Sequence, residues 1–510
     1  MACRPRVFFS PSRSPGIPAR PWRRLLLVLA FGLLGACGTQ EDPALRFGLA
    51  AAPVTLDPRF ATDAVSTRLT RLLYQSLVDF DANLRPVAGL AGWERLGPLH
   101  YRFTLVPGDH RFHDGTPLTA RDVKATYDSI LDPASASPHR GGLDMIEAIT
   151  RVDDRTVDFH LSRPDALFPG RLVVGIVPAA AIAAGRSLQR EPLGSGPFVF
   201  GAWPAEGDLR LLRRRDGAEV RFLKLADPTV RVLKLLRGEL DVLQSDLPPE
   251  LVAWLSARDE LQVSHEKGTN FSYLGFNMED PLTGQRELRR AVAHGVDRQA
   301  IISHVMGGAA RPAGALLPPD HWAGRADLKG YDHDPEAARR LIERVAARVG
   351  STPRITYKTS SSPFRVRLAT VIQHQLKAVG LDVDVNSYDW GTFYGDVKAG
   401  RFQMYSLAWV GIKMPDIFRY VFHSDSVPPH GANRGRYSSP RADALMEAAE
   451  QAATQAEQAR LYRELQHLLY VELPYVPLWY EDHVVVASKR LWGYHVPPDG
   501  NYDSLVEATW

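Results

Sequence analysis

Histidine side chains are spread along the chain without the spacing that a metal site requires. The 16 histidines include no H-E-x-x-H motif and no helical pairing with a carboxylate of the kind that binds zinc. His110 and His113 lie three residues apart in a turn-rich segment, and His423 and His430 flank a proline-rich loop. We expect these four to be solvated or packed side chains. No metal is therefore predicted.

The sequence also lacks the motifs of common catalytic centres. Ser195 lies in Gly194-Ser195-Gly196, which does not have the G-x-S-x-G spacing of a nucleophile elbow. A tight turn before a strand at 198–200 explains it better. Asp153 and Asp154 are adjacent carboxylates in a turn, and no glycine loop with a phosphate-binding lysine is present. We expect neither an enzymatic reaction nor a cofactor.

Aromatic and polar residues gather instead in four glycine-rich or extended segments. These segments are 268–273, 276–277, 388–390 and 408–411. Aromatic walls with free backbone polar groups are typical of a cleft that binds a small molecule. The same residues are equally typical of a protein core, and composition alone does not separate these two interpretations.

The first third of the chain has the pattern of β-strands. Alternating apolar residues predict a strand over 100–106, and 149–161 predicts two strands that turn at Asp153-Asp154. A helix lies between them, with Thr119 as its amino-terminal cap and Asp122 as the capping-box acid.

Helices and strands alternate in the later part of the chain. One helix opens at Asp334-Pro335 and ends at Gly350, with an apolar stripe that consists of Ala338, Leu341, Ile342, Val345 and Val349. The following elements are predicted as strand 354–359, helix 364–379, strand 381–387, helices 441–452 and 455–469, and strand 475–480. A β-α-β run implies parallel strands joined by a right-handed crossover. This is an α/β architecture, in which ligands bind beyond the carboxyl ends of strands or between domains.

Length and composition indicate a globular protein with more than one packed unit. The chain has 510 residues, of which 45% are apolar and 23% charged, and only two cysteines, Cys3 and Cys37. Residues 1–36 hold six of the 61 basic residues and none of the 58 acidic ones. The remainder thus has 55 basic against 58 acidic residues, a net charge of −3, which gives no support to nucleic-acid binding.

The amino terminus has the pattern of an export signal. Arg23-Arg24 precede an apolar run over 25–36, which is shorter than the roughly 20 residues of a membrane-spanning helix. The ending Leu34-Gly35-Ala36-Cys37 resembles a bacterial lipobox. This resemblance implies a signal peptide over 1–36, lipidation at Cys37 and a tether over 37–43. Gly38 favours the outer membrane in a bacterium with two membranes.

A set of landmarks then resembles a known family, the extracellular solute-binding proteins of the peptide and nickel importer class, family 5. The landmarks, in chain order, are 55–58, 101–105, 112–123, 192–198, 238–242, 273–277, 290–292, 296–298, Asn433, Tyr437, 439–440 and 474–477. The segment Phe112 to Val123 is the most specific of them.

This resemblance implies a periplasmic-binding-protein-like α/β fold of type II, cluster C. Two lobes are expected, with an extra domain appended to the first. The expected limits are lobe one over 44–75, 190–268 and 482–510, the appended domain over 76–189, and lobe two over 269–481. The hinge would lie near Gly268 and Tyr480.

The resemblance also implies a mode of action. A peptide or other small ligand selects the closed form of the two lobes, and the permease of an ABC importer recognises that form. The protein is expected to be a periplasmic monomer held to a bacterial membrane by lipid. A ligand-sensing or surface lipoprotein of the same fold, without its own importer, is the alternative.

One position departs from the peptide-binding members of the family. In those members, an aspartate that pairs with the peptide's amino group follows the segment at Trp409, and here Ile412 stands in its place. A buried ammonium without a carboxylate partner is costly. Either Asp416 has taken over the role or the ligand lacks that charge. Lys413 would favour an anionic group if it faces the ligand.

The expected ligand site follows from these segments. We expect Trp409, Gly411, Tyr273 and Asn277 to line one cavity in the closed form. Ile412 is expected to face the cleft. Tyr388 and Trp390 are expected as neighbours of this cavity.

Overall fold

The structure is a computed structural model that describes residues 10, 43–205, 207–245 and 247–510. The predicted signal peptide, Cys37, Gly38 and nearly all of the tether therefore lie outside the described residues. Within the described part of the chain, no helix has both the length and the apolar character needed to cross a bilayer.

A four-stranded antiparallel sheet forms in the first third of the chain. Its order is β4 (Ala91–Gly97), β5 (His100–Leu105), β7 (Thr156–Leu161) and β6 (Ile146–Arg151). Helix α3 (Ala120–Leu131) contacts β6 and β7, and the capping box of Thr119 and Asp122 is present. The predicted strands and the predicted helix cap are thus confirmed.

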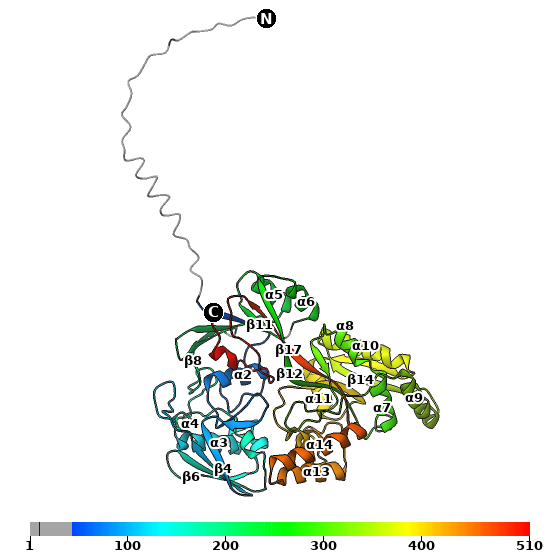
Figure 1. The fold of residues 1–510 in the computed structure, drawn as a ribbon, viewed down its shortest axis with the longest axis horizontal. Coiled ribbons are helices and arrows are strands. Elements are labelled where there is room, and N and C mark those ends of the chain that lie inside the picture. Colours follow the sequence, from blue (N-terminus) through cyan, green and yellow to red (C-terminus); the bar gives the residue numbers. More distant parts are fainter. Residues whose placement is uncertain (1–9, 11–42, 206, 246) are drawn as a thin grey trace. The chain divides into compact units, whose positions relative to one another are not determined.

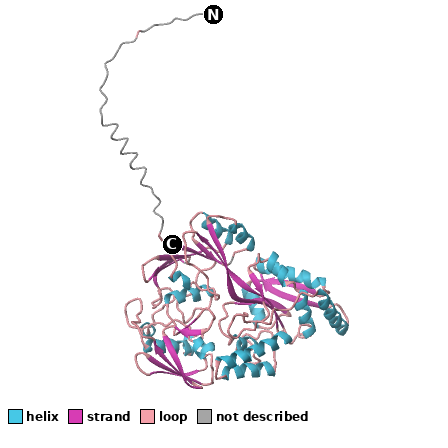
Figure 2. Cartoon of the chain, in the orientation of Figure 1, coloured by secondary structure: helices cyan, strands magenta, loops and turns pink. Residues whose placement is uncertain are grey.

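The other large element is a mixed sheet of eleven strands. Figure 2 shows its strands in magenta and the helices that lie beside them in cyan. The order is β15-β14-β16-β12-β17-β11-β1-β10-β9-β8, and β13 pairs with β17. The strands not described elsewhere are β1 (Leu45–Leu49), β8 (Phe198–Ala205), β9 (Asp208–Arg213), β10 (Glu219–Lys224), β11 (Val242–Gln244) and β13 (Ala310–Pro312).

Three parallel strands with their helices form one end of this sheet. Strand β14 (Arg354–Ser360) lies between β15 (Asp382–Tyr388) and β16 (Met404–Trp409). Helices α10 (Pro363–Ala378) and α11 (Trp390–Lys398) connect these strands. The chain therefore leaves β14 toward β15 and returns past it to β16, so a crevice opens at the carboxyl ends of β14 and β16.

Two long strands connect the two halves of the large sheet. Strand β12 (Leu261–Phe276) runs antiparallel to β17 (Tyr475–Ser488), and both lie at the centre of Figure 1. Their register shifts between Glu266 and Asn270. A Cβ at Gly268 would lie 2.2 Å from the carbonyl oxygen of Glu481, so glycine is required where the strands approach most closely. Beyond the shift, β12 also pairs with β16.

The helices predicted in the later chain are present. Helix α9 (Pro335–Val349) begins after the cap Asp334 and ends at Gly350, which has a φ of 75°. Val349 was expected in its apolar stripe but is exposed, because it occupies the last position of the helix. Helices α13 (Pro440–Gln451) and α14 (Gln455–Glu472) pack side by side (Figure 1).

Short elements complete the described part. The helices are α2 (Ala64–Leu73), α4 (Ala179–Ala183), α5 (Pro228–Leu236), α6 (Pro249–Ser256), α7 (Arg286–Gly295), α8 (Arg298–His304) and α12 (Ile417–Phe422), and the strands are β2 (Val78–Phe80) and β3 (Pro86–Ala88). Single 3-10 turns lie at 133–135, 140–143, 168–171 and 503–506.

Buried apolar clusters follow the predicted lobes with two differences. One cluster lies almost entirely within the expected appended domain, from Leu77 to Ile176. However, Val177, Ala181 and Leu188, also expected in that domain, pack with Leu45 of lobe one. Leu167, expected there too, packs in a cluster of lobe two. The exact domain limits and the hinge stay predictions.

Candidate ligand-binding site

The segment after β16 contains several of the predicted site residues. Trp409 is the last residue of this strand and lies opposite Phe271 of β12. Gly411 has a φ of +63°, a left-handed conformation that favours glycine, and its amide donates to Asn270 Oδ1 at 3.0 Å. The bend expected after the strand is therefore present.

Trp409 lies between a buried aromatic stack and a more exposed ring. Its ring is nearly parallel to that of Tyr273, with centroids 6.5 Å apart, and it meets Tyr420 edge-on at 6.1 Å. The guanidinium carbon of Arg434 lies 4.8 Å from the Trp409 ring centroid. The half-buried Trp409 thus contributes to core packing, and its predicted contact with ligand stays a prediction.

Tyr273 and Ile412 are buried among apolar side chains. Tyr273 is fully buried, stacks on Tyr475 at 3.8 Å, and its hydroxyl accepts a hydrogen bond from Arg434 Nη1 at 3.3 Å. Ile412 is 6% exposed and belongs to the same buried cluster. An ionised carboxylate at position 412 would be desolvated in these surroundings, so the apolar side chain fits the local environment.

Asn277 is not brought together with Trp409. It follows the end of β12, where its amide nitrogen donates to Gln403 O at 3.1 Å and its side chain donates to Gly400 O at 3.3 Å. Gln403 directly precedes β16, and Trp409 is its last residue. The two residues are six positions apart, which is roughly 20 Å along a strand. The side chain of Asn277 stabilises a turn at the opposite end of this strand.

Trp390 and Tyr273 line a cavity of about 210 Å³ at the carboxyl ends of β14 and β16. Ala408 and Val410, on either side of Trp409, line it too. Trp390 is 59% exposed and stacks on Tyr394 at 5.2 Å. Tyr388 ends β15 near Lys358, whose Nζ lies 5.4 Å from the Tyr388 ring centroid.

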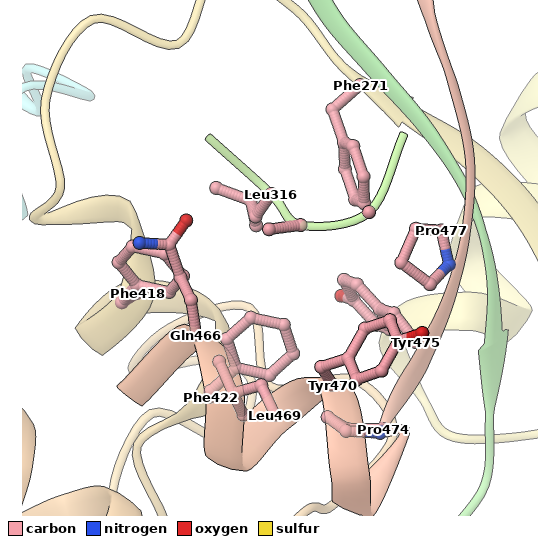
Figure 3. A pocket seen from close by; sticks show the side chains of 12 residues that line it. Phe271, Leu316, Phe418, Phe422, Gln466, Leu469, Tyr470, Pro474, Tyr475 and Pro477 are labelled. Carbon is pink, nitrogen blue, oxygen red and sulfur yellow. The ribbon is translucent and has the colours of Figure 1, made fainter. Parts of the chain in front are cut away.

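A small pocket beside this region is a gap in the core. Figure 3 shows that its lining comes largely from aromatic and proline side chains, including Phe271, Phe418 and Phe422. Its volume is about 30 Å³, which is near the volume of one water molecule. It is too small for a solute.

A much larger cavity, of about 960 Å³, is lined by residues far apart in the sequence. They come mainly from 58–90, 138–143, 170–175, 413–430 and 503–506. This volume lies within the range of about 300–1,000 Å³ that is typical of small-molecule sites. Among the predicted site residues, Asp416 is the one that lines it.

Charged side chains of both signs line this cavity in matched pairs. Arg71 Nη2 lies 3.0 Å from Asp79 Oδ1 and 2.7 Å from Asp503 Oδ2. Lys413 also lines the cavity, and its Nζ lies 2.6 Å from Oδ2 of Asp499, which is beside the lining residues in an ion pair but not one of them. Burial opposes ionisation of Asp499, but Lys413 and Arg71 hold the pKa of this carboxyl below its usual value.

Asp416 is held by an arginine from the expected appended domain. Arg171 Nη1 lies 2.8 Å from Asp416 Oδ2, and Arg171 Nε lies 2.6 Å from Asp165 Oδ2. Burial raises the pKa of Asp416, and the charge of Arg171 offsets part of this rise. The charge of Asp416 is thus already partnered by Arg171, which weakens its attraction for a ligand ammonium.

Sequence reasoning missed most of the charged lining. Arg71 and Asp503 are 432 residues apart, and each lies in a segment without a recognisable ligand-binding motif. Of the charged lining residues, only Lys413 and Asp416 were considered, because both follow the position of the missing aspartate. No local pattern in the sequence distinguishes Arg71 from the chain's other arginines.

Comparison with known proteins identifies the family. Residues 84–427 match the family model of the bacterial extracellular solute-binding proteins, family 5, middle region. This match covers more than half of the chain, so the chain belongs to this family. Family 5 proteins are the substrate-binding, non-enzymatic components of ABC transporters and are periplasmic or extracellular.

Curated relatives extend over almost the whole chain. Di/tripeptide-binding protein 2 of Pseudomonas aeruginosa is 27% identical over 521 aligned positions, which cover 94% of this chain and 97% of the relative. A dipeptide-binding protein of the same species is 26% identical, with the same coverage.

Solved structures support the same two-lobed α/β fold. CtaP from Listeria monocytogenes has a TM-score of 0.81 at 23% identity and covers 91% of this chain and 99% of its own. NikZ from Campylobacter jejuni, in complex with Ni(L-His), has a TM-score of 0.78 at 21% identity, with coverage of 92% and 99%. The predicted fold class and family are confirmed.

Proposed function

We propose that this chain captures a small solute in the 960 Å³ cavity and delivers it to the permease of an ABC importer. The observation that carries the proposal is the lining of this cavity, which joins segments of lobe one and the appended domain to residues 413–430 of lobe two. A solute held there touches both sides and stabilises the closed form over the open one.

The proposed ligand is a peptide-like or other small solute that does not need a free amino end for recognition. Two features support this. Position 412 carries a buried isoleucine, and the nearby carboxylate of Asp416 is already paired with Arg171. The relatives' printed names mention dipeptides and tripeptides, so this chain would differ from them in how one end of the ligand is bound.

Native mass spectrometry of protein isolated from its own host tests the binding role. We expect one small molecule per chain, released on denaturation and identifiable by fragmentation. Tyr420 lines the cavity, so Tyr420→Ala should reduce the fraction of chains that carry the ligand. Tyr331 does not line the cavity, so Tyr331→Ala serves as the matched control. A ligand-free protein that also binds nothing from a host extract would contradict the proposal.

We further propose that the mature chain begins at Cys37 and is anchored to a membrane by lipid. The lipobox-like sequence Leu34-Gly35-Ala36-Cys37 supports this. Cys37→Ser should abolish incorporation of labelled fatty acid and release the protein from the membrane fraction, whereas Cys3→Ser should leave both unchanged. Continued labelling of Cys37→Ser would contradict the anchor.

A further inference from the structure

Three potential metal ligands share one face of the four-stranded sheet. His100 of β5 lies directly opposite His160 of β7, and Arg102 lies opposite Asp158. Side chains alternate along a strand, so these four residues project from the face opposite to that of the buried Tyr101, whose neighbours in the core include Phe168.

The ligand atoms of this group are close together. His100 Nε2 lies 3.1 Å from Asp158 Oδ2, and the two imidazole rings stack with centroids 4.4 Å apart. One nitrogen from each histidine and one oxygen of Asp158 all lie within 4.8 Å of one another. Asp158 is buried, whereas both histidines are half-buried.

We propose that His100, Asp158 and His160 form a binding site for a divalent transition-metal ion of the zinc type. Two imidazole nitrogens and one carboxylate oxygen are donors that suit Zn²⁺, Ni²⁺ and Cu²⁺. Bonds of about 2.0–2.2 Å in a tetrahedral site place the donors roughly 3.4 Å apart, a separation that His100 Nε2 and Asp158 Oδ2, at 3.1 Å, already meet. Rotation of the half-buried histidine rings brings the nitrogens inward, and solvent supplies the remaining ligand.

Arg102 positions the carboxylate of this site. Its Nε donates to Asp158 Oδ1 at 2.8 Å and its Nη2 donates to Asp158 Oδ2 at 2.8 Å. Hydrogen-bonded partners of this kind orient a metal-ligating carboxylate. Glu94 lies opposite Arg102 on β4, so two carboxylates outweigh the single guanidinium and the face attracts a cation.

The site is separate from the proposed solute cavity. None of the three ligands lines the 960 Å³ cavity. Metal binding here and solute binding there are therefore independent, and failure of one proposal leaves the other standing.

Calorimetric titration of the intact protein with Zn²⁺ tests the site, using a purification tag without histidine. We expect one high-affinity ion per chain, and binding at least about tenfold weaker in His100→Ala and in His160→Ala. The matched control is the double variant His304→Ala/His374→Ala, which removes two exposed histidines of α8 and α10 and should bind Zn²⁺ as the wild type does.

A spectroscopic measurement identifies the ligands directly. Cu²⁺ bound to the wild type should show two imidazole nitrogens by electron paramagnetic resonance, and one in each single histidine variant. Circular dichroism confirms that the variants fold, and His160→Gln replaces any variant that does not. Zn²⁺ affinity unchanged in both single variants would mean adventitious binding and overturn the proposal, as would failure of the wild type to bind Zn²⁺.

Discussion

At the scale of single residues, aromatic side chains join the cavity wall to the core behind it. Tyr420 is half exposed and lines the 960 Å³ cavity, and its ring meets that of Trp409. Trp409 in turn stacks beside the fully buried Tyr273. A contact with ligand at Tyr420 and a packing role at Trp409 are thus separable by mutation.

We expect Tyr420→Ala to weaken binding of the co-purified ligand by about tenfold or more, because an aromatic contact in the cavity is lost. Trp409→Ala should mainly lower the free energy of unfolding, by about 2–4 kcal/mol, because removal of a large packed ring leaves a hole. Calorimetry and urea unfolding measure the two effects. Lost affinity with normal stability in Trp409→Ala would place this residue in the cleft, as the sequence predicts.

The apolar residue at position 412 leads to a prediction about peptides. An unmodified tripeptide should bind weakly or not at all, and acetylation of its amino end should change its affinity little, because Ile412 offers the ammonium no partner. Calorimetry with both forms provides the comparison. Sub-micromolar binding of the free tripeptide that is lost on acetylation would refute this, and Asp416→Asn would then locate the partner.

His321 should make the stability of the protein depend on pH. It is buried, Ala323 N donates to its Nδ1 at 3.0 Å, and its Nε2 lies 3.0 Å from Lys413 O. Burial lowers the pKa of His321 to about 4, whereas the unfolded chain keeps a value of about 6.5. The stabilisation is complete above pH 6.5 and is lost as the pH falls toward 4, because the unfolded state binds the proton first.

Urea unfolding at pH 7 and pH 4.5 measures this effect. Between pH 7 and pH 4.5, the free energy of unfolding of the wild type should fall by about 1–3 kcal/mol more than that of His321→Gln, which does not titrate at this position. The exposed His304 provides the control, since His304→Gln should retain the wild-type pH dependence. Equal pH dependence in the wild type and His321→Gln would contradict the prediction.

Residue-level predictions from sequence succeeded where the cause was local. The bend at Gly411 follows from its position after an apolar strand. Asn277 and Asp503 show the limit of such reasoning. Asn277 belongs to a turn at the far end of β16, and Asp503 reaches the cavity only because the chain's last residues fold back against α2.

At the scale of elements, a short turn of the expected appended domain connects to α12 and α13. Arg171, which ends the 3-10 turn at 168–171, pairs with Asp416 just before α12. In the same region, Ala166 N donates to Glu450 O at 3.0 Å. Burial raises the pKa of the Glu450 carboxyl, against the charge of Arg419. Ionic and backbone hydrogen bonds thus join the segment 166–171 to the residue before α12 and to α13.

We expect Arg171→Met to favour the open form and to weaken solute binding. It leaves Asp165 and Asp416 without their guanidinium, at a cost of up to about 3 kcal/mol that opening relieves through hydration. Arg163→Met is the control. Arg163 lies a few residues before Arg171, and its ion pair with Asp144 is exposed. X-ray scattering and calorimetry that give the same results for both variants would contradict this role.

Elements were predicted well where periodicity is strong. Helix α9 has a cap, an apolar stripe and a terminal glycine, and it forms as expected. Strand β17 was predicted to end at Tyr480 but continues to Ser488. Its polar stretch over 481–483 obscured the continuation, which depends on pairing with β12 more than 200 residues earlier.

At the scale of the whole molecule, the two long strands β12 and β17 connect two sets of buried clusters. Strands β12 and β17 take part in both halves of the large sheet, and their register shifts where Gly268 lies against Glu481. We expect that motion that bends this pair opens the 960 Å³ cavity and separates Leu167 from the lobe-two cluster in which it packs. The family's landmarks made this architecture predictable, whereas the ligand depends on side chains that the landmarks do not include.

X-ray scattering of the protein without ligand and saturated with the co-purified ligand tests the central claim most directly. A solute bound between two lobes should reduce the radius of gyration, and the open form should return when the ligand is removed by partial unfolding and refolding. Tyr420→Ala should require more ligand to reach the same closed state. A ligand that binds one to one yet leaves the radius of gyration unchanged would contradict the account.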